Sequence, residues 1–481
     1  MTSPLGSAAA PTVAETEVLV IGGGPGGYTA AFRAADLGSQ VALVDARATL
    51  GGVCLNVGCI PSKALLHVAK VITDAQAMAR HGIRFVAPEI DLRALRTYKD
   101  EIVGKLTRGL AGLARQRKVG VIQGTATFDS PHSVIVRNDK GERKIRFAHC
   151  IIAAGSSPAQ IPGLAGDDPR LLDSTGALEL PDLPPRMLVV GGGIIGLEMA
   201  TVYDALGSRV SVVEMADGLI LDADRDLVAV LQARLAKRYE AIMLRTRVAR
   251  IDARPDGLLV HFEGAAAPGE AQLYQLVLLA VGRSPNGKQL GADRAGVAVD
   301  EKGFIPVDRQ RRTNVSHIFA IGDLVAGPML AHKATHEGRV AAEAIAGFDA
   351  RFDPATIPSV AYTDPEIAWM GLTEADAKEA GIGYQVGVFP WAASGRALSI
   401  DRTDGLTKLV VDPKSKRLLG AGIVGVGAGE LIAETVVALE GGADVHSLMH
   451  AIHPHPTLSE SVALAAEIVD GSITDLFMPK R

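Results

Sequence analysis

The sequence predicts an α/β protein in which two related βαβ domains are followed by a C-terminal α+β domain. A glycine-rich turn between a short apolar strand and a helix occurs near residue 22 and again near residue 191. Each turn leads through a helix to a second strand that ends at an acidic residue. From about residue 351, hairpin-like strands separated by Pro and Gly turns replace this pattern and indicate a further domain.

The composition is that of an ordinary globular protein. The chain has 481 residues, of which 48% are hydrophobic and 21% charged, and this length accommodates roughly three domains. A net charge of −5 predicts no general attraction to nucleic acid or an anionic membrane surface. No apolar run approaches about 18 residues, so we expect no membrane span. Residues 1–17 show no targeting signal and are expected to form a flexible tail, and three cysteines suit a reducing cytoplasm.

The first βαβ unit carries a G-x-G-x-x-G pattern. Strands are predicted at 18–21 and 41–44, with a helix at 28–37 between them, and the pattern glycines are Gly22, Gly24 and Gly27. These glycines let the backbone approach a pyrophosphate at the helix N-terminus. Asp45, at the end of the second strand, is placed to accept a hydrogen bond from a ribose hydroxyl.

The second unit repeats the first at a constant offset, since the differences 191 − 22, 196 − 27 and 214 − 45 are equal. The matching residues are Gly191, Gly193, Gly196 and Glu214. One glycine fingerprint is a weak signal, but two in register with their helices and acidic residues predict two dinucleotide sites. Glu214 is followed by Met, Ala and Asp, with no cation to pair a 2′-phosphate, so the second site favours NAD over NADP.

The first copy contains additional sequence. Gly155, after the strand at 151–154, corresponds to Gly282 of the second copy. The difference 282 − 155 is smaller by 42 than the difference 191 − 22, so the first copy carries about 42 extra residues. The position of these extra residues matches the segment 51–80, which contains two of the three cysteines. The sequence therefore predicts a dithiol element inserted directly after the first nucleotide site.

The inserted segment has the pattern of a reactive thiol. Cys54 and Cys59 are separated by four residues, and Pro61 is suited to the first turn of a helix predicted from residue 62 to 79. A helix N-terminus beside Cys59, with the cation Lys63 nearby, stabilises a thiolate. A structural disulfide and a zinc site are the alternatives, but nothing else indicates an oxidising compartment and no second cysteine pair is present.

Electron transfer from a dithiol to a nicotinamide calls for a flavin. Thiolates do not deliver hydride, whereas a flavin accepts electrons from sulfur and passes hydride on, so the first site is interpreted as binding FAD. The strand at 317–321 ends in Gly-Asp, and Asp323 suits either a hydrogen bond to a polyol or an ordinary strand-end turn. A helical run is predicted from Met329 to Ile345.

Three histidines gather near the C-terminus, at 450, 453 and 455. Thr457 and Glu460 form a capping-box pattern before a helix predicted at 462–469. Glu460 is also placed to orient His455 for proton transfer, and the two roles are compatible. The prolines between the histidines prevent a helical pair of ligands, so no metal site is predicted.

These motifs resemble the flavin disulfide oxidoreductase family, in particular its dihydrolipoyl-oxidising bacterial members. The similarity extends from residue 17 to about 476 and is carried by residues 52–63, 191–198, 329–333 and 455–460. Pro454 stands where the family pattern has alanine. The resemblance implies two Rossmann-like dinucleotide-binding domains plus a C-terminal α+β dimerisation domain. The expected boundaries are 1–156 for the FAD domain with its redox-disulfide insertion, 157–282 for the NAD domain, 283–350 for a central segment completing the FAD site, and 351–481 for the dimerisation domain.

The resemblance also implies residue roles. Cys54 would be the interchange thiol and Cys59 the thiol against the flavin, and Lys63 would lie near the flavin and pair with Glu198. His455, oriented by Glu460, would be the acid–base acting on the disulfide of the partner subunit. The remaining FAD contacts would be Gly22, Gly24, Gly27, Asp45, Gly155, Asp323, Met329, Leu330, Ala331 and His332. The NAD contacts would be Gly191, Gly193, Gly196, Glu214 and Gly282.

The activity implied is oxidation of protein-bound dihydrolipoyl groups of 2-oxo acid dehydrogenase complexes, with reduction of NAD⁺. The expected partners are a second copy of the chain, the lipoyl-bearing acyltransferase of such a complex and the lipoyl carrier of glycine cleavage. Residues 1–17 are too few for a lipoyl domain, so we expect the lipoyl group on another protein. The alternatives are a glutathione- or mercuric-type reductase and a catalytically silent dinucleotide-binding scaffold.

Overall fold

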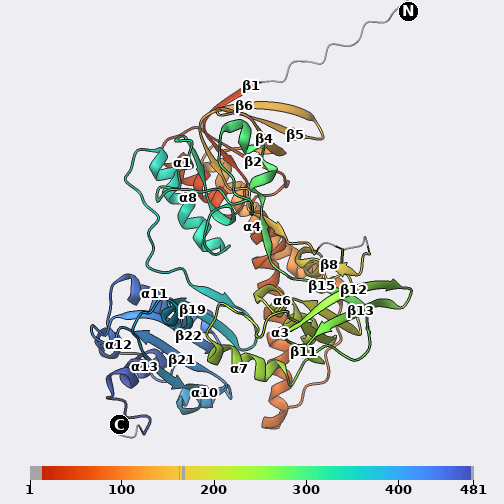
Figure 1. The fold of residues 1–481 in the computed structure, drawn as a ribbon, viewed down its shortest axis with the longest axis vertical. Helices are drawn as coiled ribbons and strands as arrows, with labels where there is room; N and C mark the ends of the chain where they lie inside the picture. Colours follow the sequence, from red (N-terminus) through yellow and green to blue (C-terminus); the bar gives the residue numbers. More distant parts are fainter. Residues whose placement is uncertain (1–12, 162, 165–167, 478–481) are drawn as a thin grey trace, which may run out of the picture. The chain divides into compact units, whose positions relative to one another are not determined.

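A computed structural model describes residues 13–161, 163, 164 and 168–477 (Figure 1). Of the predicted flexible tail, residues 1–12 lie outside this range. Residues 13–17 correct the prediction, because they begin strand β1 (Val13–Ile21). They pair with strand β6 (Gly141–Ile152), with Val13 opposite Lys144. The chain divides into two compact units, which are described separately.

The first unit comprises residues 1–61, 97–159 and 283–353. Its main sheet has seven strands, in the order β3, β2, β1, β6, β5, β4, with β17 also on β6. The other bounds are Val41–Asp45 for β2, Gly120–Gln123 for β3, Thr125–Ser130 for β4, Ser133–Asn138 for β5 and Ile318–Ala320 for β17. Strands β1, β2, β3 and β17 run parallel to their neighbours, whereas β4, β5 and β6 form an antiparallel meander.

Two helices of this unit pack against each other at very short range. Helix α1 (Pro25–Asp36) follows the first glycine turn, and helix α8 (Ala331–Ile345) begins at Ala331 rather than at the predicted Met329. A Cβ placed on Gly338 would lie 2.5 Å from the carbonyl oxygen of Gly26. Glycine is required at this crossing because the two backbones are in contact.

The second unit comprises residues 62–96, 160–282 and 354–481. It contains a parallel sheet in the order β11, β10, β9, β15, β8 and a three-stranded antiparallel sheet of β12, β13 and β14. The bounds of the parallel sheet are Leu171–Leu172 for β8, Arg186–Val190 for β9, Arg209–Val213 for β10, Ala241–Met243 for β11 and Leu276–Leu279 for β15. The antiparallel strands are Thr246–Arg254 for β12, Gly257–Gly264 for β13 and Gln272–Tyr274 for β14. Helices α6 (Ile194–Ala205) and α7 (Arg225–Leu235) belong to the same part of the chain.

The C-terminal part of this unit is the predicted α+β domain. Its antiparallel sheet runs in the order β18 (Ser359–Ala361), β19 (Glu366–Gly371), β22 (Leu418–Gly425), β21 (Leu406–Val411), β20 (Gln385–Pro390). Its longer helices are α11 (Ala428–Glu440) and α13 (Glu460–Asp470), with the shorter α12 (Val445–His450) between them.

Lys408 on β21 is buried among the carboxylates of Asp224, Asp226 and Glu374, with Nζ 2.7 to 2.8 Å from each. This cluster ties α7 to the C-terminal sheet.

The segment after the first nucleotide turn is helical. Helix α2 (Gly52–Val57) is followed by α3 (Cys59–Ala77) and a 3₁₀ turn, η1 (Met78–His81). Within the described residues, the stretch Gly52–His81 is long and apolar enough to cross a membrane by length and composition. Core helices meet the same criterion, and Leu65 and Leu66 of α3 are buried in the core of the second unit.

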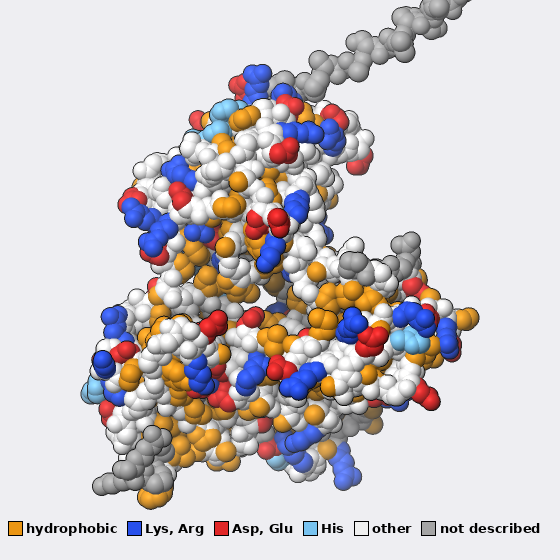
Figure 2. Space-filling view, viewed as in Figure 1, with side chains coloured by type: hydrophobic (Ala, Val, Ile, Leu, Met, Phe, Trp, Pro, Cys, Tyr) orange, Lys and Arg blue, Asp and Glu red, His pale blue; other side chains and the backbone are white. Residues whose placement is uncertain are grey.

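The remaining helices are α4 (Leu92–Gln116), α5 (Ser174–Leu178), α9 (Glu374–Glu379) and α10 (Gly395–Ser399), and the remaining strands are β7 (Ser156–Pro158) and β16 (Arg283–Pro285). On the face drawn in Figure 2, Lys and Arg side chains are intermixed with Asp and Glu side chains. This arrangement agrees with the small net charge.

Candidate active site

The first glycine turn is closed by the acidic residue that follows β2. Asp45 Oδ2 accepts from the Gly23 N–H at 2.5 Å, and its Oδ1 accepts from the Arg47 N–H at 2.7 Å. A Cβ on Gly27 would lie 1.8 Å from the carbonyl oxygen of Gly22, so the start of α1 requires glycine there. The carboxylate of Asp45 is thereby fixed beside the N-terminus of α1, where a ribose is expected next to a pyrophosphate.

The second turn repeats this arrangement bond for bond. Glu214 accepts from the Gly192 N–H at 2.7 Å and from the Ala216 N–H at 2.8 Å. A Cβ on Gly196 would lie 2.3 Å from the Gly191 carbonyl oxygen. The strands also pair in matching register, with Ile21 opposite Val44 and Val190 opposite Val213. The predicted internal repeat is confirmed.

Two glycines of the repeats are not required by the packing of the chain. A Cβ on Gly193 would meet nothing within 4 Å, and one on Gly24 would meet only Gly52 Cα at 3.9 Å. Their φ angles of −79° and −69° suit any residue. A ligand that approaches the backbone closely explains glycine at both positions, and a dinucleotide pyrophosphate is such a ligand. The residues present therefore fit the two dinucleotides.

Asp323 lies in a short 3₁₀ turn, η4 (Gly322–Leu324), after β17. Its Oδ2 accepts from the Ser156 hydroxyl at 2.5 Å, and Ser156 in turn accepts from Arg283 Nε at 2.7 Å. Gly155 and Gly282 have φ angles of +66° and +113°, so the backbone itself requires glycine at both positions. Met329 and Leu330 precede α8, with Ala331 and His332 in its first turn, and His332 is exposed.

The two cysteines occupy successive helices. Cys54 lies within α2 and is half-buried, and Cys59 is the first residue of α3 and is exposed. The prediction that α3 begins at residue 62 is wrong by three residues, because Gly58, with φ −146° and ψ −113°, separates the helices and lets α3 start at Cys59. Pro61 still falls in the first turn, where its missing N–H costs nothing. Cys59 therefore lies at the positive end of a 19-residue helix.

Sequence reasoning missed an aromatic residue beside this segment. Tyr28, in the first turn of α1, has its pKa raised by burial and, to a smaller extent, by the negative charge of Cys54. The raised pKa keeps the phenol neutral at neutral pH. Its only sequence signal is its position directly after the glycine pattern.

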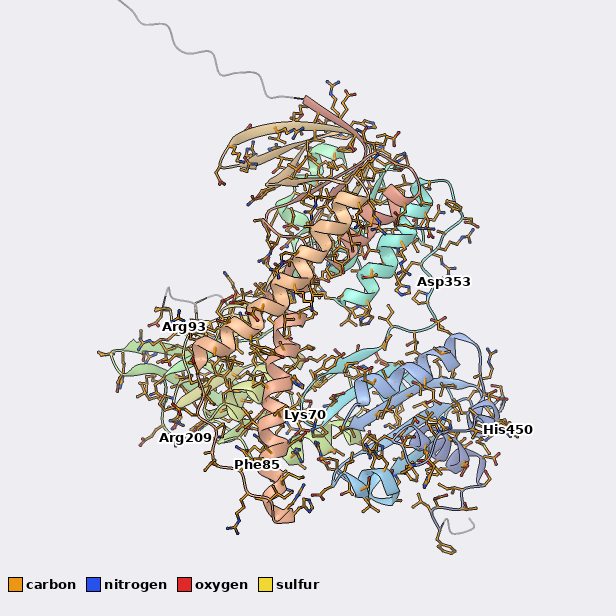
Figure 3. The ribbon with its side chains drawn as sticks, turned by 180° about the vertical axis from the view of Figure 1, so that it is seen from behind. Lys70, Phe85, Arg93, Arg209, Asp353 and His450 are labelled. Carbon is orange, nitrogen blue, oxygen red and sulfur yellow. The ribbon has the colours of Figure 1, made fainter. Side chains whose placement is uncertain are left out.

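Lys63 and Glu198 form a closely coupled pair within the second unit. Lys63 Nζ lies 2.9 Å from both carboxylate oxygens of Glu198. The Glu198 side chain is buried and also accepts from the Tyr362 N–H at 3.1 Å, while Lys63 lies over the Tyr362 ring at 4.5 Å. Tyr362 is a second residue that the sequence did not single out. Figure 3 labels Lys70, two turns further along the same helix.

His455 and Glu460 also lie together. His455 Nδ1 is 2.9 Å from Glu460 Oε1, and the Thr457 N–H donates to Glu460 Oε2 at 2.7 Å. Burial raises the pKa of Glu460, but the Thr457 N–H and His455 outweigh it, so the net pKa is lowered. An ionised Glu460 only accepts hydrogen bonds, so Nδ1 carries the proton and Nε2 is left as the basic nitrogen.

The predicted capping box is only half formed. Helix α13 begins at Glu460, before the predicted start at residue 462, so its N-cap residue is Ser459 and Thr457 lies two residues ahead of the cap position. The Thr457 hydroxyl donates to the Pro454 carbonyl at 2.7 Å. The helix-start and histidine-orienting roles of Glu460 are compatible because each uses a different carboxylate oxygen.

The other two histidines of the segment have different surroundings. His453 Nε2 lies 2.6 Å from Glu434 Oε1 and its Nδ1 lies 2.8 Å from the Ala451 carbonyl oxygen. Both nitrogens face acceptors, so neither is left to take a proton from a substrate. His450, labelled in Figure 3, is exposed at the end of α12. Within the described part of the chain, no group of three or more His, Cys, Asp or Glu residues is placed to hold a metal ion.

Comparison with known proteins places this arrangement in a family. Residues 16–338 match the pyridine nucleotide-disulphide oxidoreductase model, and residues 357–466 match the dimerisation domain of the same family. The chain therefore belongs to the pyridine nucleotide-disulphide oxidoreductases and, within them, to the dihydrolipoyl dehydrogenase family. It is an FAD- and NAD-dependent oxidoreductase, and its dimerisation domain supports a homodimer.

Individual relatives cover almost the whole chain. The dihydrolipoyl dehydrogenase of Vibrio cholerae is 53% identical over 96% of this chain and 97% of its own length. Among solved structures, LpdA of Mycobacterium tuberculosis has a TM-score of 0.87 at 26% identity, covering 94% of this chain and 99% of its own. The HOCl-induced flavoprotein disulfide reductase RclA of Escherichia coli has a TM-score of 0.83 at 29% identity, covering 95% and 99%.

Proposed function

We propose that this protein oxidises dihydrolipoyl groups carried by the acyltransferase of a 2-oxo acid dehydrogenase complex, and by the lipoyl carrier of glycine cleavage, with reduction of NAD⁺ to NADH. The observation that carries this proposal is the position of Cys59 at the first residue of α3, with Cys54 on the preceding helix. A helix N-terminus stabilises the thiolate that dithiol exchange produces.

The reaction begins with the two cysteines joined as a disulfide. His455 Nε2, with Nδ1 held by Glu460, takes a proton from one substrate thiol. The substrate thiolate attacks the Cys54 sulfur, and Cys59 leaves as a thiolate. His455 releases its first proton to solvent and takes one from the second substrate thiol, whose sulfur displaces Cys54 as a thiolate and closes the lipoyl disulfide. Bound FAD supplies the two-electron acceptor that links this dithiol to NAD⁺.

The residues proposed to hold FAD lie in the first unit. They are Gly22, Gly24, Gly27, Asp45, Gly155, Asp323, Met329, Leu330, Ala331 and His332. Gly191, Gly193, Gly196, Glu214 and Gly282 are proposed to hold NAD. Lys63, paired with Glu198, is proposed to act beside the flavin.

The proposed domains are 1–156, 157–282, 283–350 and 351–481, and the family's dimerisation match at 357–466 falls inside the last. The placement of segments 1–61 and 283–353 in one unit supports the central segment as part of the FAD domain.

The homodimer belongs to the proposed mechanism. His455 is proposed to act on the cysteine pair of the partner subunit, and the high exposure of its side chain, 79% in the single chain, supports this. The proposed location is the cytoplasm, where three cysteines in a chain of this size would be kept reduced except at the redox pair.

The test is NAD⁺ reduction by free dihydrolipoamide with purified holoenzyme, beside NADPH-dependent reduction of oxidised glutathione. We expect the first activity and not the second. His455→Gln should abolish most turnover while leaving the flavin bound, and His450→Gln is the matched control from the same segment. Glutathione reduction without lipoamide oxidation would refute the proposal.

A further inference from the structure

Helix α8 holds both backbone polar groups of Gly322. Glu337 Oε2 accepts from the Gly322 N–H at 2.7 Å, and Lys333 Nζ donates to the Gly322 carbonyl oxygen at 2.9 Å. Lys333 and Glu337 are one turn apart on α8, so they lie on the same face. Gly322 has a φ of +78° and directly precedes Asp323. The position of the Asp323 backbone is therefore set by this pair.

The pair is fully enclosed. Glu337 is 0% exposed and Lys333 is 3% exposed. Lys333 Nζ lies 3.4 Å from Glu337 Oε1, and Arg311 Nη1 donates to the same oxygen at 3.1 Å. Burial raises the pKa of Glu337 and lowers the pKa of Lys333, so both groups carry a desolvation cost. Fold stability alone does not require such a pair, because well-packed apolar residues of similar volume are often as stabilising or more so.

The same helix also contacts the phosphate-binding end of α1. A Cβ on Gly26 would lie 2.9 Å from the Ala334 carbonyl oxygen, and one on Gly338 would lie 2.5 Å from the Gly26 carbonyl oxygen. Through Ala334 and Gly338, α8 is thus in backbone contact with the first glycine turn. Through the adjacent Lys333 and Glu337, it holds the turn before Asp323. The distance between the two turns is fixed by one rigid element.

We propose that Lys333 and Glu337 are positioning residues of the FAD site. The inference rests on the proposed function, which places FAD between the first glycine turn and Asp323. A dinucleotide that contacts both turns binds tightly only if their separation is already correct, because ordering a loose turn on binding weakens affinity. The pair supplies that order through its hydrogen bonds to Gly322.

The test is titration of the apoprotein with FAD, followed by flavin fluorescence, for Glu337→Gln, Lys333→Met and the double variant Lys333→Met/Glu337→Leu. Each change should weaken FAD binding about 10- to 100-fold, the loss expected for one hydrogen bond to a charged group. Glu343→Gln is the matched control, because it removes an ion pair between α8 and α1, to Arg33 at 2.7 Å, without touching Gly322. It should bind FAD as the wild type does.

The double variant separates positioning from stability. Urea unfolding of the apoprotein should show its stability restored to near the wild-type value, while FAD binding stays weak. Recovery of both together would mean that the pair only stabilises the fold, and would overturn the inference.

Two further variants test the proposed FAD site itself. Gly24→Leu fills space that the fold leaves open, and Asp323→Asn removes the carboxylate. Wild-type FAD affinity in both would refute the proposed site. Loss of FAD in both, with normal affinity in all Lys333 and Glu337 variants, would refute only the positioning role.

Discussion

His455 Nδ1 lies 2.9 Å from Glu460 Oε1, and the other oxygen of Glu460 accepts from the Thr457 N–H. The carboxylate therefore fixes both the tautomer and the ring orientation of the histidine. The proposed role of Glu460 in proton transfer is separable from its role at the helix start, because a glutamine keeps the size of the side chain but not its charge.

Glu460→Gln should lower kcat about 10- to 100-fold with little change in KM, because the imidazolium loses its stabilising anion. Steady-state kinetics with dihydrolipoamide measure both constants. An unchanged kcat would show that Glu460 serves only the helix start.

The lowered pKa of Glu460 predicts a pH-dependent stability. A carboxyl group with a folded-state pKa below its unfolded value contributes stability above the unfolded value, about 4.5, and loses it as pH falls through the folded value. Wild type should therefore be more stable than Glu460→Gln at neutral pH, and the difference should shrink on acidification. Denaturant unfolding at several pH values measures this. A difference that stays constant down to strongly acid pH would contradict it.

Lys63→Met should leave the buried carboxylate of Glu198 without its cation. Unfolding free energy should fall by about 1–3 kcal/mol, since the buried Glu198 carboxylate loses its partner but the Lys63 side chain is 34% exposed and solvent partly screens the charge. The double variant Lys63→Met/Glu198→Leu should recover most of this stability but not the activity. Denaturant unfolding and turnover, measured on the same samples, distinguish the two effects. Recovery of activity with stability would assign the pair a structural role alone.

The second nucleotide site should be convertible toward NADP⁺. The Glu214 carboxylate accepts hydrogen bonds from the Gly192 and Ala216 N–H groups, and the next residue, Met215, is 72% exposed. Arg245 Nη2 lies 4.0 Å from Asp217, a cation that tertiary structure brings near the turn from another part of the chain. Glu214→Ser with Met215→Arg should raise the NADP⁺ to NAD⁺ ratio of kcat/KM at least about tenfold, through pairing with a 2′-phosphate. Met215→Gln is the control, and an unchanged ratio in the double variant would place the ribose elsewhere.

Local features of this protein were readable from its sequence. The two glycine turns and the acidic residues that close them depend on backbone conformations and on contacts between neighbouring strands, so the internal repeat predicted both. The closeness of His455 and Glu460 was likewise foreseeable, because they are near each other along the chain. Where local prediction was wrong, the tertiary structure decided the outcome. Helix α13 has Ser459 rather than Thr457 as its N-cap residue, which leaves the capping box incomplete, and residues 13–17 pair with β6 instead of fraying.

The sequence by itself determined two glycine turns each closed by an acidic residue, an inserted segment with two cysteines, and a histidine beside a glutamate, because the residues of each feature lie close together along the chain. Only the tertiary structure decided which distant groups meet: Tyr28 beside Cys54, Tyr362 beside the Lys63–Glu198 pair, and Lys333 and Glu337 on Gly322. Those contacts depend on how helices pack in a shared core. Burial strengthens the contacts between charged side chains, and burial has no local signature in the sequence.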